Sequence, residues 1–581
     1  CKGITIVRST ANLGFLKNCN SAAEHARGEY IFFLNNDTQV KPGWLSSLVT
    51  LIESDPSIGM VGSKLIYPDG RLQEAGGIFW REGNGWNYGK FDDPDKPEYN
   101  YVKDVDYISG AAIMLSAKLW RQLGGFDERF APAYCEDADL AFAVREAGYR
   151  VVYQPLSVVV HYEGISNGTD TGSGIKAYQA ANMEKLKEKW ASAFAKQEVH
   201  GERPNPFAAR ERLQNRKVIL AIDHYVPTFD KDAGSKSTYQ YIKLFLRKGY
   251  VVKLVGDNYG REEPYTTAFQ QMGVEVLYGR WYEENILSWI EENKKYIQFA
   301  YINRPHIAIK YMDFIRKKTD IKIMYYGHDL HFLREQREYE VTGDPAHKKE
   351  SDYMKKQELS LIRTADMSYY PSYVERDVLH EIDGSLRVKA VCLNMFESFK
   401  EDIDFDFTKR KGLLFVGGFA HHPNKDAVMW FVEEIWPLIR RKMEIPFYIV
   451  GSKAPEEILA LDGREGIVVK GFVSDQELEA LYGACQVVVV PLRFGAGVKG
   501  KVIESLYYGM PTVTTSIGAE GIEGVEQVLS VADTAAEFAQ KTLQYCKNAE
   551  LSAKTGHDAM AFVKDTFGME AVWEIVKEDF Q

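Results

Sequence analysis

The chain has 581 residues, 45% hydrophobic and 26% charged, which is the balance of an ordinary globular protein with several domains. Its net charge of −11 disfavours nucleic acid as a partner, because polyanion binding depends on clustered lysine and arginine. Its longest apolar runs have the length of strands, too short for a bilayer-spanning helix. The six cysteines are scattered without a CxxC pair, which indicates a reduced, cytoplasmic protein without a cysteine-bound metal.

Strand-like apolar runs alternate with helical patterns along the chain, which predicts an α/β fold with mostly parallel sheets. In the first part, Gly3–Val7 and Tyr30–Asn36 are predicted strands, and a helix is expected between them at residues 18–26. A longer helix is expected at residues 175–195. The polar segment 201–216, interrupted by prolines, is predicted to be a linker.

A second run of strands begins at Lys217–Asp223 and continues to Asn394. A third run begins at Gly412–Gly418, after an acidic connection, and a capping box at residues 474–477 starts one of its helices. We therefore expect α/β domains at residues 1–200, 217–395 and 396–581.

Acidic residues in the first part stand where they can hold a metal or move a proton. Asp37 follows a predicted strand, where a carboxylate either holds Mg²⁺ or Mn²⁺ beside a diphosphate or only caps the next turn. Glu136, Asp137 and Asp139 crowd the start of a predicted helix, so that one of them can have a pKa suited to proton abstraction. Such acids are often only partners of the helix dipole, an interpretation that suits Asp139. His161 is either a metal ligand or a core residue.

The order of the motifs FLNNDTQV, GAA, GGFDE, EDADL and HYEG resembles that of glycosyltransferase family 2 over residues 3–190. The resemblance implies a GT-A-like fold and an inverting, metal-dependent transfer from a nucleotide-sugar donor. Asp37 matches the last acid of the family's DxD-type metal motif, in which Asn35 replaces the first. Asp137 matches the general base that deprotonates the acceptor, and His161 matches a position that completes the metal site.

The chain begins after the strands that hold the nucleobase and ribose in this family. We expect that Cys1 is a fragment start and that the strand at Ile31–Leu34 exposes either an apolar face or an unpaired edge. We also expect that the first module alone binds a nucleotide-sugar weakly.

The second part carries another set of motifs. Gly234 lies ahead of a predicted helix, where small residues either let N–H groups approach an anion or form an ordinary turn. His328 follows a predicted strand. A glycine-rich loop at residues 495–500 leads into a helix with Lys501 and Glu504 three residues apart. These two side chains can bind a diphosphate and ribose hydroxyls, or they form a surface ion pair.

These motifs resemble glycosyltransferase family 4 over residues 217–580, which implies a GT-B fold of two Rossmann-like subdomains and a retaining, metal-independent transfer. Gly234 matches the donor-phosphate loop, and His328 the catalytic-site histidine. Glu504 matches the second acid of a Glu-x7-Glu motif, and Ala496 replaces the first. The expected donor-binding residues are Gly234, Gly418, Gly495, Gly497, Lys499, Lys501 and Glu504, with Lys425 as a further candidate and the diphosphate lysine left open.

The sequence therefore predicts an enzyme that builds a cell-surface glycan by two transfers. Its partners would be nucleotide-sugars and a glycan or lipid-linked glycan acceptor, and it would act in the cytoplasm at the inner face of the membrane with peripheral association. An alternative is a carbohydrate-binding or scaffold protein with one or both sites inactive, which Ala496 favours and the retained Asp37, Asp137 and His161 oppose. In a third interpretation only the second module is active.

Overall fold

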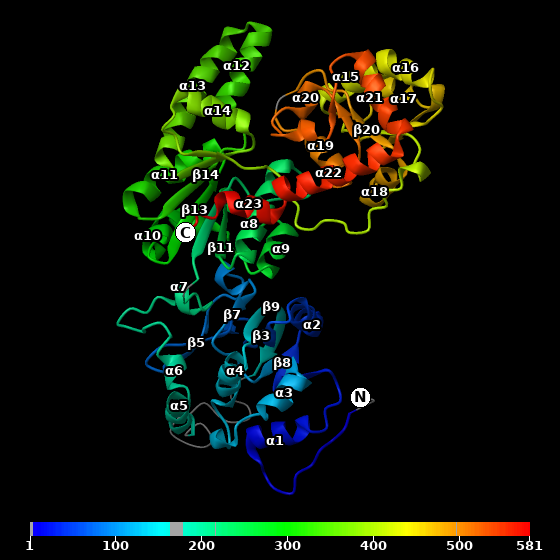
Figure 1. Cartoon of the computed structure of the whole chain (residues 1–581). Helices are drawn as coiled ribbons and strands as arrows, with labels where there is room; N and C mark the ends of the chain where they lie inside the picture. Colours follow the sequence, from blue (N-terminus) through cyan, green and yellow to red (C-terminus); the bar gives the residue numbers. More distant parts are fainter. Residues whose placement is uncertain (1–3, 163–177, 215, 496) are drawn as a thin grey trace. The chain divides into compact units, whose positions relative to one another are not determined.

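The structure is a computed structural model that describes residues 4–162, 178–214, 216–495 and 497–581 (Figure 1). It has the α/β fold that the sequence predicts, with one mixed sheet and two parallel sheets. The chain divides into two compact units, one of residues 1–226, 245–300 and 319–321 and one of residues 227–244, 301–318 and 322–581. The domain boundaries expected from the sequence stay predictions.

The mixed sheet has the strand order β1-β8-β3-β9-β2, with β4 paired to β3 and β7 paired to β9. Its main strands are β1 (Tyr30–Leu34), β2 (Thr38–Val40), β3 (Ile58–Ile66), β8 (Ala112–Ser116) and β9 (Arg150–His161). Strands β3 and β9 are parallel, whereas β1 with β8 and β2 with β9 are antiparallel. Helices α2 (Trp44–Ser54) and α4 (Glu136–Glu146) pack on β9.

The strand predicted at Gly3–Val7 is wrong where the structure describes it. Residues 4–9 have no regular structure, and Ile4 and Ile6 are 66% and 70% exposed. A row of alternating apolar residues forms a strand only where a neighbouring strand pairs with it. Among the described residues, β1 ends the sheet and pairs with β8 alone, so it is the edge strand that the sequence led us to expect.

The helix expected at residues 175–195 is present as α5 (Tyr178–Lys189) and α6 (Ala191–Phe194), while residues 175–177 lie outside the described residues. The predicted linker contains a short helix, α7 (Pro206–Ala209), capped by the Asn205 side chain. Phe207, Arg210 and Glu211 in and after this helix are buried. This connection is therefore packed into the first compact unit along much of its length.

The first parallel sheet has the order β12-β11-β10-β13-β14-β15-β16. Its strands are β10 (Val218–Asp223), β11 (Val251–Gly256), β12 (Glu275–Leu277), β13 (Ile297–Asn303), β14 (Lys322–Tyr326), β15 (Met367–Tyr370) and β16 (Val388–Ala390). The first six follow the Rossmann order 3-2-1-4-5-6.

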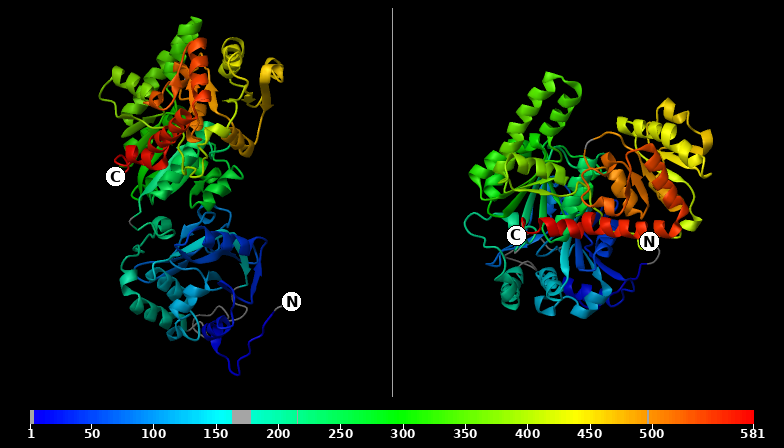
Figure 2. Two further views of the ribbon diagram at one scale, coloured as in Figure 1. Left: turned by 45° about the vertical axis from the view of Figure 1, so that its right-hand side comes forward. Right: turned by 45° about the horizontal axis from the view of Figure 1, so that its top comes forward.

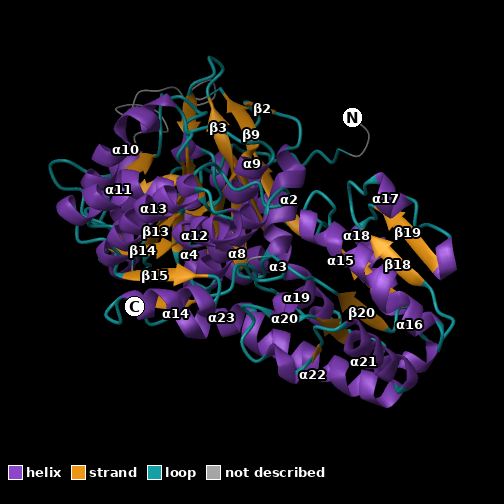
Figure 3. Cartoon of the chain, turned by 90° about the horizontal axis from the view of Figure 1, so that it is seen from above, coloured by secondary structure: helices purple, strands orange, loops and turns teal. Residues whose placement is uncertain are grey.

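The second parallel sheet repeats this order as β19-β18-β17-β20-β21-β22. Its strands are β17 (Leu413–Val416), β18 (Phe447–Val450), β19 (Ile467–Gly471), β20 (Val487–Val490), β21 (Thr512–Thr514) and β22 (Ser530–Val531). Helices α19 (Gly500–Tyr507) and α21 (Ala535–Lys547) both pack on β20 and cover different faces of the sheet (Figure 3). The strand order reverses between β17 and β20.

The carboxy-terminal helices return to the first parallel sheet, as expected. Helix α22 (Ala549–Phe567) leads into α23 (Met569–Val576), drawn in red in Figure 2. The Asp579 carboxylate beyond α23 accepts hydrogen bonds from Lys389 Nζ and Tyr369 Oη, each at 2.9 Å. Because Tyr369 and Lys389 lie on β15 and β16, these bonds tie the end of the chain to that sheet.

Candidate functional site

Asp37 and His161 are brought together by the pairing of β2 with β9. Thr38 lies opposite His161 in this antiparallel pair, which places the preceding Asp37 carboxylate with its Oδ1 3.3 Å from His161 Nε2. Both side chains are 11% exposed, and Asp37 Oδ1 is buried without a hydrogen bond. On the other side of the ring, His161 Nδ1 lies 3.2 Å from Gln73 Oε1.

These contacts orient His161 as a metal ligand would be oriented. The Gln73 carbonyl oxygen only accepts, so Nδ1 is the donor of this contact and Nε2 is the ring nitrogen that faces Asp37. A carboxylate oxygen without a hydrogen bond beside an imidazole nitrogen suits a divalent cation. No group of three or more metal-ligating side chains occurs among the described residues. Asp37 and His161 would therefore hold Mg²⁺ or Mn²⁺ as a pair, with the other positions left to diphosphate oxygens or water.

Asp137 lies in the first turn of α4, behind a loop with left-handed backbone at Tyr134 and Cys135. Its Oδ2 accepts a 2.8 Å hydrogen bond from Gly110 N, and its Oδ1 accepts one of 2.8 Å from Ala138 N. A Cβ atom at Gly110 would come 3.4 Å from Asp137 Cβ, so the glycine lets the two segments approach. Burial raises the pKa of Asp137, and the two N–H groups counteract it.

The two neighbouring acids have different surroundings. Burial, and to a smaller extent the charge of Asp137, raises the pKa of Glu136 to about 8, and Glu136 Oε2 is buried without a hydrogen bond. Asp139 accepts hydrogen bonds from Trp190 Nε1 at 2.7 Å and from Lys189. Asp139 therefore connects the first turn of α4 to the end of α5 and the residue after it, a structural contact in addition to the helix-dipole partnership considered from the sequence.

Asp37 of the predicted metal pair and the predicted base Asp137 lie on backbone segments that are joined by hydrogen bonds. Asn35 N, at the end of β1, donates to Ala111 O at 3.0 Å, next to the Gly110 that binds Asp137. Thr38 Oγ1 donates to Asn35 O at 2.6 Å and so closes the turn that carries Asp37. Within the first unit, short hydrogen-bonded steps thus connect Asp37 with Asp137.

The second predicted site lies where the order of the second parallel sheet reverses. Gly417 and Gly418 follow β17, and the glycine-rich loop follows β20 and leads into α19. Gly495 and Gly497 have φ of 138° and 72°, values that favour glycine, while Ala496 lies outside the described residues. The Lys501 amine donates to Asn424 Oδ1 at this edge of the sheet.

Lys499 has different partners. Its Nζ donates to Gly497 O, lies 3.5 Å from Gly495 O and forms an ion pair with Glu520 at 3.7 Å. Lys425, the further candidate, instead forms an exposed ion pair with Glu457 at 2.8 Å.

Glu504 lies on α19 with its carboxyl largely buried. Burial raises its pKa, Lys236 on α8 (Ala233–Arg247) lowers it and Asp475 raises it again. Lys501 pairs with Asn424, so the contacts of the two residues are not those of the simple surface ion pair considered from the sequence.

Gly234 is the second residue of α8, within the helix and not ahead of it as expected. A Cβ atom there would come 2.4 Å from Arg304 Nη2, a side chain that the sequence analysis missed. The N–H of Ser235 donates to Asp232 Oδ1 at 2.8 Å, so a carboxylate caps this helix. His328 has φ of 68°, and its Nε2 lies 3.2 Å from Asn303 Oδ1.

Two family models match the chain. Residues 1–120 match the one described as Glycosyl transferase family 2, and residues 410–548 match the one described as Glycosyl transferases group 1. The chain therefore carries two segments that match glycosyltransferase family models. Below, the parts of the chain whose motifs resemble these families are called the family 2 module (residues 3–190) and the group 1 module (residues 217–580).

Bacterial relatives agree with this assignment. O-antigen biosynthesis protein RfbC of Myxococcus xanthus is 33% identical over 162 residues, which are 26% of this chain and 12% of that protein. N-acetylglucosaminyl-diphospho-decaprenol L-rhamnosyltransferase of Mycobacterium tuberculosis is 27% identical over 191 residues, 30% of this chain and 60% of that protein. The chain therefore spans less than two thirds of the length of these curated relatives.

Solved structures match more of the chain at lower identity. Sucrose-phosphate synthase from Thermosynechococcus elongatus is 15% identical, with a TM-score of 0.45, over 63% of this chain and 98% of that one. HepE of Anabaena, in complex with UDP and glucose, is 14% identical, with a TM-score of 0.42, over 63% of this chain and 99% of that one.

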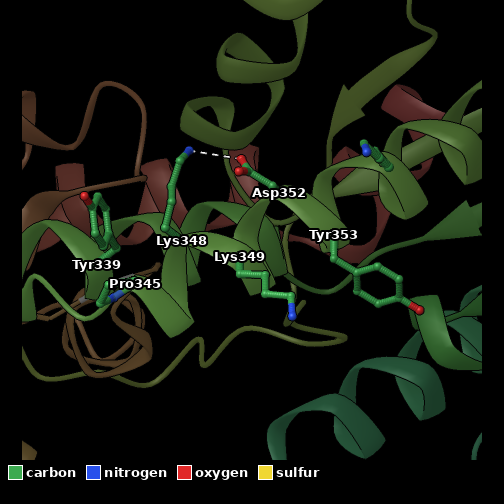
Figure 4. A pocket seen from close by; sticks show the side chains of 7 residues that line it. Tyr339, Pro345, Lys348, Lys349, Asp352 and Tyr353 are labelled. Carbon is green, nitrogen blue, oxygen red and sulfur yellow. Dashed lines mark ion pairs between the residues drawn. The ribbon is translucent and has the colours of Figure 1, made fainter.

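A hollow of about 500 Å³ lies on the helical hairpin of α12 (His331–Thr342) and α13 (Pro345–Thr364). The sequence analysis did not predict this hairpin. The hollow is lined by Tyr339, Pro345, Lys348, Lys349, Asp352, Tyr353 and Lys356, and Figure 4 shows Lys348 turned towards Asp352. That ion pair is 3.0 Å long, and the surface around it carries more lysine than acid. Within the described parts of the chain, no helix is both long and apolar enough to span a bilayer.

Proposed function

We propose that the chain transfers sugars from nucleotide-sugar donors to a growing cell-surface glycan of the polysaccharide or O-antigen type, and that both modules are active. The observation that carries the proposal is the Asp37–His161 pair, an unsatisfied carboxylate oxygen 3.3 Å from an oriented imidazole nitrogen in the family 2 module. The names of the M. xanthus and M. tuberculosis relatives support the class of acceptor.

In the family 2 module, Asp37 and His161 would hold Mg²⁺ or Mn²⁺, which offsets charge on the leaving diphosphate when it is bound. Asp137 accepts the proton of the acceptor hydroxyl as the new glycosidic bond forms. The hydrogen bonds from Gly110 N and Ala138 N keep this carboxylate ionised and fixed in spite of its burial. Attack from the face opposite the leaving group inverts the configuration of the sugar.

In the group 1 module, the cation of Lys501 and the glycine-rich loop at the start of α19 bind the donor diphosphate without a metal, and Glu504 accepts from ribose hydroxyls. Gly234, Gly418 and His328 complete the donor and sugar contacts. This transfer retains the configuration of the sugar.

The test is a donor panel of UDP-, GDP- and dTDP-sugars with the full chain and two variants. Asp137→Asn should abolish a metal-dependent transfer and leave a metal-independent one, and Lys501→Met should do the reverse. Lys409→Ala, in an exposed ion pair with Asp406, is the control and should leave both unchanged. Binding of a donor without turnover by the unaltered chain would instead favour the scaffold alternative.

For the membrane association expected from the sequence, we propose the lysine-lined face of α12–α13 as the contact with anionic lipid headgroups. Lys348, Lys349 and Lys356 share this face with a single lining acid, Asp352. Sedimentation with phosphatidylglycerol vesicles should fall severalfold in a Lys349→Glu/Lys356→Glu variant and stay unchanged in the control Lys442→Glu/Lys470→Glu. Equal binding by both variants would contradict this surface.

A further inference from the structure

Lys499 in the glycine-rich loop and Lys501 in the first turn of α19 have different hydrogen-bond and ion-pair partners. Lys499 is 9% exposed, and its amine faces two carbonyl oxygens of its own loop, those of Gly495 and Gly497, together with Glu520. These acceptors surround the ammonium group, and the Gly497 carbonyl oxygen accepts its short hydrogen bond. Lys499 therefore bonds to the backbone of its own loop and stabilises the conformation of that loop.

Lys501 points towards the sheet. A Cβ atom at Gly417 would come 2.7 Å from Lys501 Nζ, so the amine lies against the backbone that follows β17. The amine also lies 5.1 Å from the centre of the Phe415 ring. Strands β17 and β20 meet here at the reversal of strand order, which is where an open α/β sheet binds its ligand.

The position of the Lys501 amine depends on one buried amide. Asn424 is 4% exposed, its Nδ2 donates to Gly418 O at 2.7 Å, and its Oδ1 accepts from Lys501. The ammonium group only donates and the carbonyl only accepts, so these two contacts fix which end of the amide faces which partner. Its own N–H donates to His421 O at 3.0 Å, which anchors the residue in the first turn of α15 (His422–Trp430).

We infer that Asn424 is a positioning residue that holds Lys501, and that Lys501, not Lys499, supplies the cation for the donor diphosphate. The inference rests on the proposed donor site of the group 1 module and adds to it the choice between the two lysines. A neutral amide suits this task because it orients the amine without neutralising it. An aspartate in its place would compete with the diphosphate for the same cation.

The pKa shifts in the ligand-free site agree with the different roles inferred for Lys499 and Lys501. Burial, and to a smaller extent the nearby charge of Lys499, lowers the pKa of Lys501 to about 8. His421, also near both lysines, has a pKa lowered by burial and by their charges. A bound diphosphate would stabilise the charged form of Lys501, so binding should be accompanied by proton uptake near pH 8.

The test is calorimetric titration of the full chain with UDP, GDP, ADP and dTDP, followed by variants with the tightest binder. Lys501→Met and Asn424→Asp should each weaken binding at least tenfold, and both should abolish the proton uptake seen in buffers of different ionisation enthalpy. A purely structural role of Asn424 would leave that uptake in place. Lys409→Ala, which removes an exposed ion pair with Asp406, should change neither quantity.

Lys499→Met should affect binding less than Lys501→Met. The opposite ranking, or unchanged binding and proton uptake in Asn424→Asp, would overturn the inference. If none of the nucleoside diphosphates binds the unaltered chain, the proposed donor site fails. The positioning by Asn424 is then tested by ¹³C NMR of the lysine Cε in the ligand-free protein, where Asn424→Asp must raise the pKa of Lys501 and an unchanged pKa would refute it.

Discussion

Replacing Arg210 by methionine is expected to lower the free energy of unfolding of the first compact unit by about 3 kcal/mol. Arg210 Nη2 donates to both carboxylate oxygens of Glu275, each at 2.8 Å, and Nη1 donates to Tyr88 Oη at 3.0 Å. The side chains of Arg210 and Glu275 are 7% and 0% exposed. Lys253 Nζ lies 2.7 Å from the same carboxylate and is also paired with Glu211.

The expected loss in the free energy of unfolding depends on which charge remains buried in the variant. Removing one partner of a buried ion pair typically costs about 3–5 kcal/mol, because the other charge stays in a poorly solvated position. Lys253 remains beside Glu275 in the variant and compensates part of this cost, so the lower end of the range applies. A second change, Glu275→Leu in the Arg210→Met background, removes the uncompensated carboxylate and should restore at least half of the loss.

Urea unfolding followed by circular dichroism measures this difference, with Arg280→Met as the control. The side chains of Arg280 and Glu284, which form an ion pair, are 87% and 55% exposed, and loss of this pair should change stability by less than about 0.5 kcal/mol.

Although burial would raise the pKa of Glu275, Arg210 and Lys253 hold it below its usual range. The stabilisation is therefore present above about pH 4.3 and lost as the pH falls through the folded-state pKa. A loss below about 1 kcal/mol at neutral pH would refute the reasoning.

Two further predictions concern the binding sites. His161→Ala should lower Mn²⁺ affinity strongly, and Gln73→Leu should lower it about tenfold because the imidazole is then free to rotate. Mn²⁺ titration followed by electron paramagnetic resonance measures these affinities. Equal affinities in the unaltered chain and the two variants would exclude the Asp37–His161 site. Glu504→Ala should weaken nucleoside diphosphate binding without changing the urea midpoint, and unchanged affinity by calorimetry would assign Glu504 a merely structural role.

The Rossmann-like halves were predictable from sequence because their strands are continuous apolar runs. Val218–Asp223 is buried at every position, and the helices between strands separate such runs clearly. The strand predicted at Gly3–Val7 has a similar apolar pattern, but a strand also needs a partner, and the pattern contains no information about partners. The α12–α13 hairpin lacks a continuous apolar run and was missed for that reason.

The site was predictable where a residue's chemistry is visible in its own motif. Asp37 and His161 could be named because each follows a strand, and the structure places them 3.3 Å apart. Asn424 could not be named, because its importance lies in a hydrogen bond to a residue 77 positions away, and the charge of its neighbour Lys425 drew attention instead. Arg210 was hidden in a polar segment that resembled a linker, because its partner Glu275 is 65 residues distant.

The last prediction concerns which acid of α4 is the base. Glu136 is 6% exposed and its Oε2 has no hydrogen bond, whereas each oxygen of Asp137 accepts one from a backbone N–H. Ionisation of the pair therefore begins at Asp137, where N–H groups stabilise the charge, and that charge then keeps Glu136 protonated. Of the two acids, Asp137 is therefore the one whose ionised form the backbone stabilises, and the one placed to accept a proton.

Glu136→Gln imitates the protonated neighbour and should keep turnover within a few-fold of the unaltered chain. Asp137→Asn should lower it by about 10²–10⁴-fold, the typical contribution of a general base. Because the pKa of Glu136 is raised to about 8, its stabilising neutral form is lost progressively as the pH rises towards and through that value. Glu136→Gln should therefore gain stability relative to the unaltered chain between pH 5 and about pH 9 in urea unfolding. If Glu136→Gln abolished turnover as completely as Asp137→Asn while remaining folded, Glu136 would have to take part in the proton transfer itself.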